Sequence, residues 1–341
     1  MKENDMGPLI QKTSRCAVIG HGSWATAITK VLTKNESSVC WYVRNQEVLE
    51  SLRTEGHNCR YLPDVEFDMN RIHLTDDVNE TINRADIIFL VTPAPYLKCY
   101  LSDLKVSLKD KMLVSAIKGI IPDENKVVTE YLKQRYGLSC AQLCFISGPT
   151  HAEEVGHGRL TYMTLACSNI GNARVVGEKL KTPFIKVSAL RNMSYLEHAS
   201  VMKNIYSVMV GMAVGLGYGD NFIAVLVSNC IKEMYFLLAP QSVNDLTKFD
   251  PSNFFGDLLV SCYSSHSRNR QLGMLIGRGN TVKTALNEMT MVAEGYYSSA
   301  MLPFLPEEQR RQLPIAEKAY QVLHQGMSAR KAMKDLENLL E

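Results

Sequence analysis

Apolar residues occur in continuous runs along the first half of the chain, without the alternation of polar positions that marks half-exposed strands. Such runs lie within residues 17–19, 37–43, 85–93, 111–119 and 142–149, and segments long enough for a helix separate them. Strands buried on both faces produce this pattern, because helices cover both sides of a parallel sheet. The runs therefore predict an α/β fold.

From about residue 191 the apolar positions take helical spacing instead. Residues 196–215 and 222–239 are long and apolar, and residues 281–341 also have the pattern of helices. A chain of 341 residues is about long enough for two domains. We therefore expect an α/β domain at residues 1–190 and an all-α domain at residues 191–341.

Charge and composition narrow the class of protein. Lys+Arg is 37 and Asp+Glu is 35, so the formal net charge is only +2. Overall charge this small does not attract nucleic acid or an anionic membrane, so a bound anion would need a local pocket. The nine cysteines form no CxxC pair or regular spacing, which predicts reduced thiols and no metal site.

The chain also lacks the features of an exported or membrane protein. Its first fifteen residues contain no apolar segment of the kind found in a secretion signal. The apolar stretch from Ile205 is short and interrupted by glycines, which argues against a membrane span. We therefore expect a cytoplasmic protein without an integral membrane segment.

A glycine turn follows the first apolar run. Gly20, Gly22 and Ala25 match the spacing G-x-G-x-x-G/A between a predicted strand and a predicted helix. Gly20 would allow a tight turn, and Gly22 would let the backbone approach a pyrophosphate at the helix N-terminus. The turn predicts a dinucleotide site, while an ordinary strand-to-helix turn is the alternative.

The end of the second apolar run carries Arg44 in place of an acidic residue. A carboxylate there commonly binds the adenosine ribose of NAD, whereas a guanidinium can bind the 2′-phosphate of NADP. NADP and NAD both remain possible, and Arg44 could equally be a solvated surface residue.

Two lysines stand in unusual positions. Lys118 follows an apolar run, where the edge of an open α/β sheet commonly binds ligands. Lys203 lies within an apolar helical segment, either with its amine extending to solvent or held by a partner in a cleft. Burial would lower the pKa of such an amine and suit it to exchange a proton with an alcohol.

A polar cluster follows at residues 257–270. Its hydroxyl, amide and guanidinium groups could bind a phosphate, although a solvated helix start would look the same. The cluster contains Asp257, Ser261, Ser267, Arg268, Asn269 and Arg270.

Taken together, these segments resemble the NAD(P)-dependent glycerol-3-phosphate dehydrogenases, in particular the bacterial biosynthetic type. The likeness runs in order along nearly the whole chain. It comprises GHGSWATA, HNCRYLP, ADIIFLVTPAPYL, AIKGI, SGPTHAEEV, MKNIYSVMVGMAVGLGYGDN, GDLLVSCYSSHSRNR, VAEGY and LPI.

The resemblance implies a Rossmann-like NAD(P)-binding domain at residues 1–190 and a helical substrate-binding domain at residues 191–341. It implies reduction of dihydroxyacetone phosphate to sn-glycerol 3-phosphate by NAD(P)H, for phospholipid synthesis, in a homodimer. By the same resemblance the catalytic groups are Lys203 as general base, Asp257 as its partner, and Lys118.

The resemblance also assigns binding residues. Cofactor contacts would come from Ser23, Trp24, Lys118, Ala152, Arg268, Val292 and Glu294, beside Gly20, Gly22 and Arg44. Substrate contacts would come from Lys118, Gly148, Thr150, Lys203, Asp257, Ser267, Arg268 and Asn269.

The chain departs from the family pattern at several places. Ala25 replaces a glycine, Ser261 replaces a threonine, and PSNFFGD replaces a glycine-rich approach to Asp257. Asn229-Cys230 stands where the family has Arg-Gly, and SYLEHASVMKN lacks two glycines of the pattern G-x-E-x-x-G-x-x-K-N. No proposed catalytic group is lost, but the shape of the substrate pocket is affected.

Two other functions fit parts of the pattern. A 3-hydroxyacid dehydrogenase shares the general plan, but the Ser267-Arg268-Asn269 element favours a phosphate substrate. A cofactor-sensing protein without catalysis would have no need to keep Lys118, Lys203 and Asp257 together.

Overall fold

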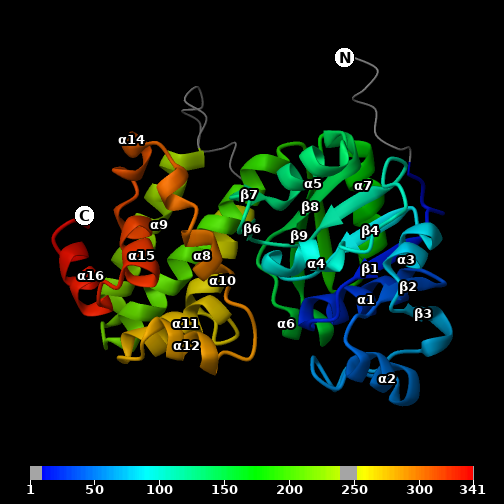
Figure 1. The fold of residues 1–341 in the computed structure, drawn as a ribbon, viewed down its shortest axis with the longest axis horizontal. Coiled ribbons are helices and arrows are strands. Elements are labelled where there is room, and N and C mark those ends of the chain that lie inside the picture. Colours follow the sequence, from blue (N-terminus) through cyan, green and yellow to red (C-terminus); the bar gives the residue numbers. More distant parts are fainter. Residues whose placement is uncertain (1–9, 239–251, 341) are drawn as a thin grey trace. The chain divides into compact units, whose positions relative to one another are not determined.

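The computed structural model describes residues 10–238 and 252–340, and the chain forms two compact units. The first unit comprises the chain up to Ile117 together with Val128–Leu196. The second comprises Lys118–Val127 and the chain from Glu197 onward. The short segment that begins at Lys118 thus belongs to the second unit, although its flanking sequence belongs to the first (Figure 1).

The first unit is built on one eight-stranded sheet, as the apolar runs predict. The strands stand in the order β10-β9-β8-β5-β4-β1-β2-β3, and every pair is parallel except β8 with β9. They are β1 (Cys16–Ile19), β2 (Val39–Tyr42), β3 (Ile72–Thr75), β4 (Ile87–Leu90), β5 (Met112–Ser115), β8 (Leu143–Ser147), β9 (Thr161–Ala166) and β10 (Ile185–Leu190).

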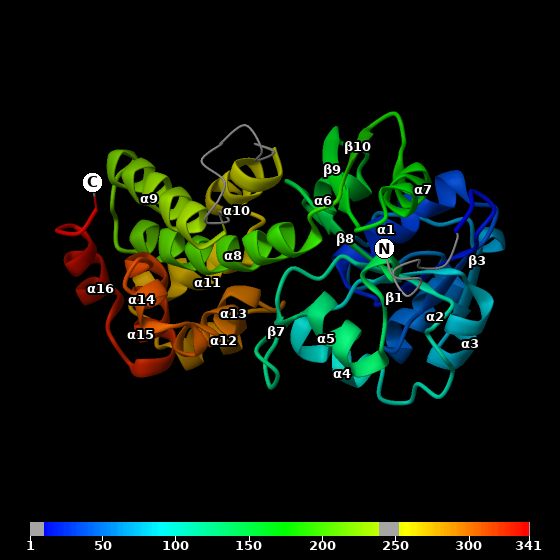
Figure 2. The same ribbon diagram turned by 90° about the horizontal axis from the view of Figure 1, so that it is seen from above.

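Helices cover both faces of this sheet, and the central strands are fully buried (Figure 2). Helices α1, α6 and α7 lie on one face, and α3, α4 and α5 lie on the other. The helices of this unit are α1 (Ser23–Asn35), α2 (Gln46–Glu55), α3 (Val78–Arg84), α4 (Leu97–Tyr100), α5 (Val128–Tyr136), α6 (Ala152–Gly156) and α7 (Ile170–Leu180). Continuous apolar runs become central strands here because no face of these strands meets water.

In its described residues the second unit is helical apart from the hairpin β6 (Ile120–Ile121) and β7 (Lys126–Val127). The hairpin packs through Ile120 and Val127 on Val201. The helices are α8 (Met193–Gly215), α9 (Asp220–Leu238), α10 (Asp257–Tyr263), α11 (Arg268–Gly277), α12 (Val282–Glu288), α13 (Glu294–Ser299), α14 (Glu307–Arg310), α15 (Pro314–Gln325) and α16 (Ala329–Leu336).

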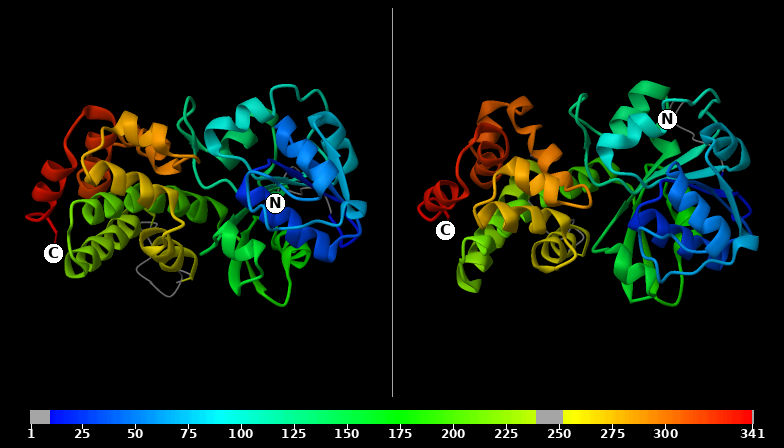
Figure 3. Two further views of the ribbon diagram at one scale, coloured as in Figure 1. Left: turned by 90° about the horizontal axis from the view of Figure 1, so that it is seen from below. Right: turned by 60° about the horizontal axis from the view of Figure 1, so that its bottom comes forward.

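Helix α8 is the central element of the second unit (Figure 3). All of its residues from 199 to 213 are buried, so its apolar character continues around the whole helix rather than forming one stripe.

Glycines bring α8 and α11 unusually close. A Cβ at Gly273 would lie 2.0 Å from the carbonyl oxygen of Val208, and one at Gly211 would lie 2.2 Å from that of Arg270. Only glycine permits this approach of the two backbones. The contact sets the N-terminal half of α11 against residues 208–211 of α8, and one turn earlier in α8 Asn204 accepts from Asn269 of α11 over 2.9 Å.

Helix α9 is long and apolar enough to cross a membrane, judged by length and composition alone, and 33% of its most apolar window is buried. One such helix is weak evidence for a membrane span, because core helices of globular proteins pass the same test.

Six of the nine cysteines are buried, and all nine are free thiols. Cys140 and Cys144, the pair nearest in sequence, lie in a 3₁₀ turn and in β8, which does not place them on one face of a helix. Pro251, part of the run before Asp257, lies outside the described residues.

Candidate functional site

The glycine turn of the first unit follows β1 and begins α1. Gly20 has φ +133°, and a Cβ there would lie 2.0 Å from the carbonyl oxygen of Val91. Any other residue would therefore have a strained backbone, and its Cβ would collide with the segment that follows β4. Gly22 has nothing within 4 Å of its Cβ position, so its backbone borders open space.

The start of α1 has the character of an anion site. Its N-cap residue, Gly22, supplies no side-chain hydrogen bond, and the first turn contains no acidic residue. The first N–H groups of the helix therefore keep their capacity to bind an external acceptor, and the helix dipole favours a negative charge there. These features fit the pyrophosphate of a dinucleotide.

Two buried side chains hold this turn in place. Trp41 donates its indole Nε1–H to the Gly20 carbonyl over 2.7 Å, and Asn58 donates to the His21 carbonyl over 2.9 Å. Asn58 also bonds Thr26 in α1. Neither residue was singled out from the sequence, since a buried Trp or Asn more often serves packing; only the contacts reveal this function.

The three other motif residues of the turn pack against the interior of the first unit. Ala25 is fully buried, which explains why a small residue is needed at the third position of the motif. Ser23 is nearly buried, and Trp24 packs against the core of the unit.

Arg44 lies two residues beyond β2, at the carboxyl edge of the sheet. Its Nη1 donates to the Cys99 sulfur over 2.6 Å, and its guanidinium lies 6.0 Å from the Tyr100 ring centroid. These contacts orient a side chain that otherwise faces solvent. Arg44 is therefore held at the place where a dinucleotide ribose would lie in this fold.

His21 lies inside the glycine turn and stays neutral. Its Nδ1 is 2.8 Å from the Tyr100 hydroxyl. Burial first, and then the nearby Arg60 and Arg44, lower the pKa of His21 to about 4. The turn thus presents backbone N–H groups, rather than a histidine cation, to an anion at neutral pH.

A second group of predicted residues follows β8. Gly148 has φ +110°, and the Thr150 hydroxyl donates to its carbonyl over 3.3 Å. Ala152 begins α6 and is buried. Because β8 and β1 run in the same direction in one sheet, this segment lies at the same edge as the glycine turn.

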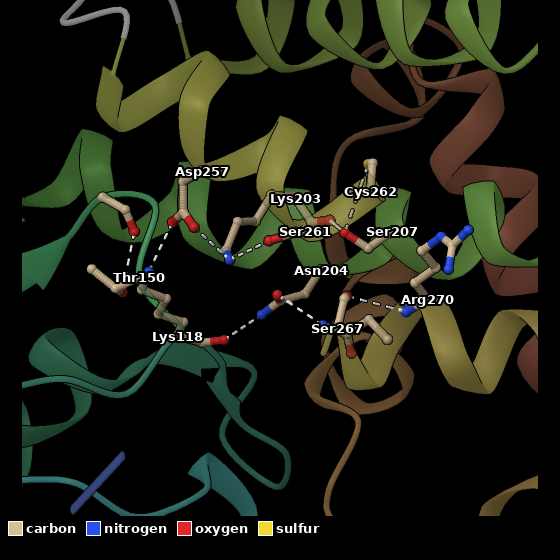
Figure 4. Close-up of polar contacts among 12 residues, drawn as sticks. Lys118, Thr150, Lys203, Asn204, Ser207, Asp257, Ser261, Cys262, Ser267 and Arg270 are labelled. Carbon is tan, nitrogen blue, oxygen red and sulfur yellow. Dashed lines mark hydrogen bonds and ion pairs between the residues drawn. The ribbon is translucent and has the colours of Figure 1, made fainter. Parts of the chain in front are cut away.

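In the second unit, Asp257 joins the two predicted lysines (Figure 4). Its Oδ1 accepts from Lys203 Nζ over 2.8 Å, and its Oδ2 accepts from Lys118 Nζ over 2.9 Å. Lys203 also donates to the Ser261 hydroxyl over 2.7 Å. Of the two interpretations of Lys203, the one with a partner is therefore confirmed.

The charges of this triad are almost removed from water. Asp257 is 1% exposed and Lys203 is 7% exposed. Burial alone would raise the pKa of Asp257, but the two ammonium groups hold it below its ordinary value. Burial also lowers the pKa of Lys118 to about 8, against the opposing effect of Asp257. With both amines protonated, the triad carries a net charge of +1.

A chain of amides fixes Lys118. Asn204 donates to the Lys118 carbonyl over 2.6 Å and accepts from Asn269 over 2.9 Å. Asn269 in turn accepts from the Gly295 N–H over 2.9 Å. Asn204 was not predicted from the sequence, although its position directly after Lys203 could have marked it as a residue of the site. Asn269, predicted to bind substrate, uses its carboxamide oxygen and one N–H within the protein.

The remaining predicted residues surround the start of α11 and α13. Ser267 is the N-cap of α11 and accepts from the Arg270 N–H. Arg268 donates to the Met291 sulfur over 3.3 Å. Glu294 is the first residue of α13, and Val292 lies two residues before it, partly exposed.

The first unit has a nucleotide-binding fold with an uncapped helix at its glycine turn, and the second holds paired lysines on a buried carboxylate. This combination defines the class of nicotinamide-dependent dehydrogenases.

Comparison with known proteins agrees with that class. Residues 15–173 match the family model for the N-terminus of NAD-dependent glycerol-3-phosphate dehydrogenase, and residues 193–334 match the model for its C-terminus. The chain belongs to this family.

Individual relatives cover nearly the whole chain. Glycerol-3-phosphate dehydrogenase [NAD(P)+] of Agathobacter rectalis is 34% identical over 95% of this chain and 95% of the relative. The enzyme of that name from Fusobacterium nucleatum is 30% identical over 94% of this chain and 96% of the relative. The crystal structure of glycerol-3-phosphate dehydrogenase from Coxiella burnetii shares the fold, with a TM-score of 0.85, 24% identity and coverage of 96% and 99%.

Proposed function

We propose that this protein reduces dihydroxyacetone phosphate to sn-glycerol 3-phosphate, reversibly, with NAD(P)H, and so supplies glycerophospholipid synthesis. The observation that carries the proposal is the buried Lys118–Asp257–Lys203 triad in a chain that matches both family models. A carbonyl oxygen that gains negative charge during reduction is stabilised by such a fixed positive environment.

Lys203 is the proton donor in this mechanism. When bound, the reduced nicotinamide supplies a hydride to the carbonyl carbon. Protonated Lys203 then gives a proton to the developing alkoxide, and in the reverse direction its neutral amine accepts the proton from the alcohol. Asp257 and Ser261 hold the Lys203 Nζ in place through two hydrogen bonds.

Lys118 supplies the second amine of the triad, and this amine binds the carbonyl oxygen of the substrate. Its pKa of about 8 keeps most of it protonated at neutral pH, so it contributes positive charge there. Asn204 orients the backbone from which it extends.

The phosphate of the substrate lies at the start of α11 in this proposal. Ser267 and Arg268 supply a hydroxyl and a guanidinium there, and α11 contributes its N–H groups. The family resemblance also assigns Gly148 and Thr150 to substrate binding. Binding of the unreactive phosphate orients the carbonyl carbon for reduction.

The cofactor is bound by the N-terminal domain predicted from the sequence, residues 1–190, and the substrate mainly by the predicted helical domain, residues 191–341, with Lys118. Gly20, Gly22, Ser23, Trp24 and Arg44 hold the dinucleotide, while Ala152, Arg268, Val292, Glu294 and Lys118 complete its surroundings. The uncapped N-terminus of α1 supports this assignment.

The protein is a cytoplasmic homodimer in this proposal. Helix α9 supports self-association, because it exposes Val225 and Phe236 to 40% and 46%. A mass near twice 38.2 kDa in analytical ultracentrifugation would support the dimer, and a mass of one chain would contradict it.

The reaction is tested by following oxidation of NADH and NADPH with purified protein. We expect turnover that depends on added dihydroxyacetone phosphate. Turnover with a 3-oxoacid and none with dihydroxyacetone phosphate would instead favour the hydroxyacid dehydrogenases. Binding of cofactor without turnover of any carbonyl substrate would favour a sensor.

A further inference from the structure

Helix α8 contains a buried serine hydroxyl that has no role in the proposed mechanism. Ser200 is 2% exposed, and its Oγ has no hydrogen-bond partner among the described residues. Burying a hydroxyl without a partner costs stability, so such a group calls for an explanation.

Ser200 lies on the same face of α8 as the residues of the site. It precedes Lys203 by three positions and Asn204 by four, and residues with these spacings are neighbours on a helix surface. Side chains on a helix lean toward its N-terminus, so the Lys203 side chain extends back over the turn that contains Ser200. The hydroxyl is also as enclosed as Asp257, which is 1% exposed.

Another serine on this helix shows that the missing partner is particular to Ser200. Ser207, four residues after Lys203, donates to the Lys203 carbonyl over 2.7 Å. A serine in a helix can thus satisfy its hydroxyl within the helix, and Ser207 does so.

We propose that Ser200 is a specificity-determining residue that binds the primary hydroxyl of the three-carbon substrate. This inference rests on the proposed function. In the proposed function the triad binds the carbonyl oxygen and the start of α11 binds the phosphate. The hydroxymethyl group of dihydroxyacetone phosphate is then the one polar group to which no residue is assigned. A neutral serine suits a neutral alcohol, because each can donate one hydrogen bond and accept another.

The test compares two substrates in wild type and in Ser200→Ala. One is dihydroxyacetone phosphate, and the other is hydroxyacetone phosphate, in which a methyl group replaces the whole hydroxymethyl group. We expect Ser200→Ala to lower kcat/KM about three- to tenfold for dihydroxyacetone phosphate, the value of one neutral hydrogen bond. For hydroxyacetone phosphate, kcat/KM should change less than twofold.

Thermal unfolding of the ligand-free protein gives an independent signature. Ser200→Ala removes an unpartnered hydroxyl and adds a better helix former, so Tm should rise by about 3 °C. The matched control, Ser207→Ala, loses a made hydrogen bond, so its Tm should fall while the preference between the two substrates stays that of wild type.

Each other outcome overturns the inference. An equal loss of kcat/KM for both substrates, or a change confined to the KM of the cofactor, would show that Ser200 does not bind the hydroxymethyl group. No change with either substrate would show that the hydroxyl binds no ligand. If wild type itself fails to reduce dihydroxyacetone phosphate, it is the proposed function that fails.

Discussion

The two units build their sites from different materials. In the first unit the candidate pyrophosphate site is one contiguous turn, residues 20–25, and the groups that it offers are backbone N–H groups at the start of α1. In the second unit the site is assembled from side chains, and Lys118 and Asp257 are 139 positions apart. A site made of backbone is thus encoded locally, whereas a site made of side chains depends on the packing of the whole unit.

The difference extends to buried carboxylates. The buried carboxylates among the described residues all lie in the second unit, and they are Glu197, Glu233 and Asp257. Taking a carboxylate out of water is costly unless opposite charge or N–H donors replace the water. The second unit therefore needs exact placement of partners, while the first unit needs mainly open backbone and small residues.

Removing the amine of Lys203 should have the largest effect. In Lys203→Met, kcat should fall about 10³-fold or more, because the proton donor is gone. Cofactor binding, measured by nicotinamide fluorescence, should stay within about threefold, because the glycine turn is untouched. Ser261→Ala, which removes one hydrogen bond to the amine, should cost about tenfold or less in kcat. An active Lys203→Met would exclude Lys203 as the donor.

The glycine turn offers a matched pair of substitutions. Gly22→Ala places a methyl group in open space, so the protein should fold normally, but the cofactor KM should rise about 30-fold, equivalent to about 2 kcal/mol. Gly20→Ala collides with the Val91 carbonyl and should mainly lower Tm. Comparing Tm and KM for both variants checks this. Unchanged cofactor binding in Gly22→Ala would contradict a backbone-made dinucleotide site.

Arg44 tests the distinction between the two cofactors. If its guanidinium binds a 2′-phosphate, Arg44→Ala should raise the KM for NADPH about tenfold and leave that for NADH within about twofold. Kinetics with both cofactors provide the measurement. A wild-type preference for NADH that survives Arg44→Ala would disprove the role.

Glu233 should have the smallest effect, and it acts on stability. Its Oε1 and Oε2 accept from the Ile315 and Ala316 N–H groups at the start of α15, and Tyr206 also donates to it. Burial nevertheless raises its pKa to about 7, from 4.5. Between pH 4.5 and about 7 the Glu233 carboxyl binds a proton more tightly in the folded protein than in the unfolded chain. Protonation of Glu233 therefore stabilises the fold at low pH, and this stabilisation is lost as the pH rises through about 7.

Glu233→Gln removes this titration while keeping the size of the side chain. The difference in Tm between variant and wild type should therefore shift in favour of the variant between pH 5 and pH 8, by about 2–4 °C. A difference that stays constant across this range would show that Glu233 does not titrate there.

Much of the fold was predictable because it rests on short-range patterns. The runs at β1, β2, β4, β5 and β8 are apolar except for a terminal serine in β5 and in β8, and each became a buried strand. The antiparallel pairing of β9 with β8 was not predictable, because strand direction depends on how the connection between them returns.

The candidate residues show the same division. Lys203 was recognised because a charge inside an apolar helix is conspicuous in any sequence. Asn58, Trp41 and Asn204 were not, because their composition and spacing are ordinary and their function lies in one or two hydrogen bonds to distant backbone groups.

By itself the sequence determined the α/β character of the first half, the helical second half, the glycine turn and the residue types available for chemistry. Each of these follows from neighbours within a few positions, whose periodicity and backbone preferences act locally. Tertiary structure alone decided that Lys118 joins the second unit, that one carboxylate serves two amines, and that the Ser200 hydroxyl is buried without a hydrogen-bond partner among the described residues. Those outcomes depend on which distant groups burial brings within hydrogen-bond distance, and no local pattern specifies that.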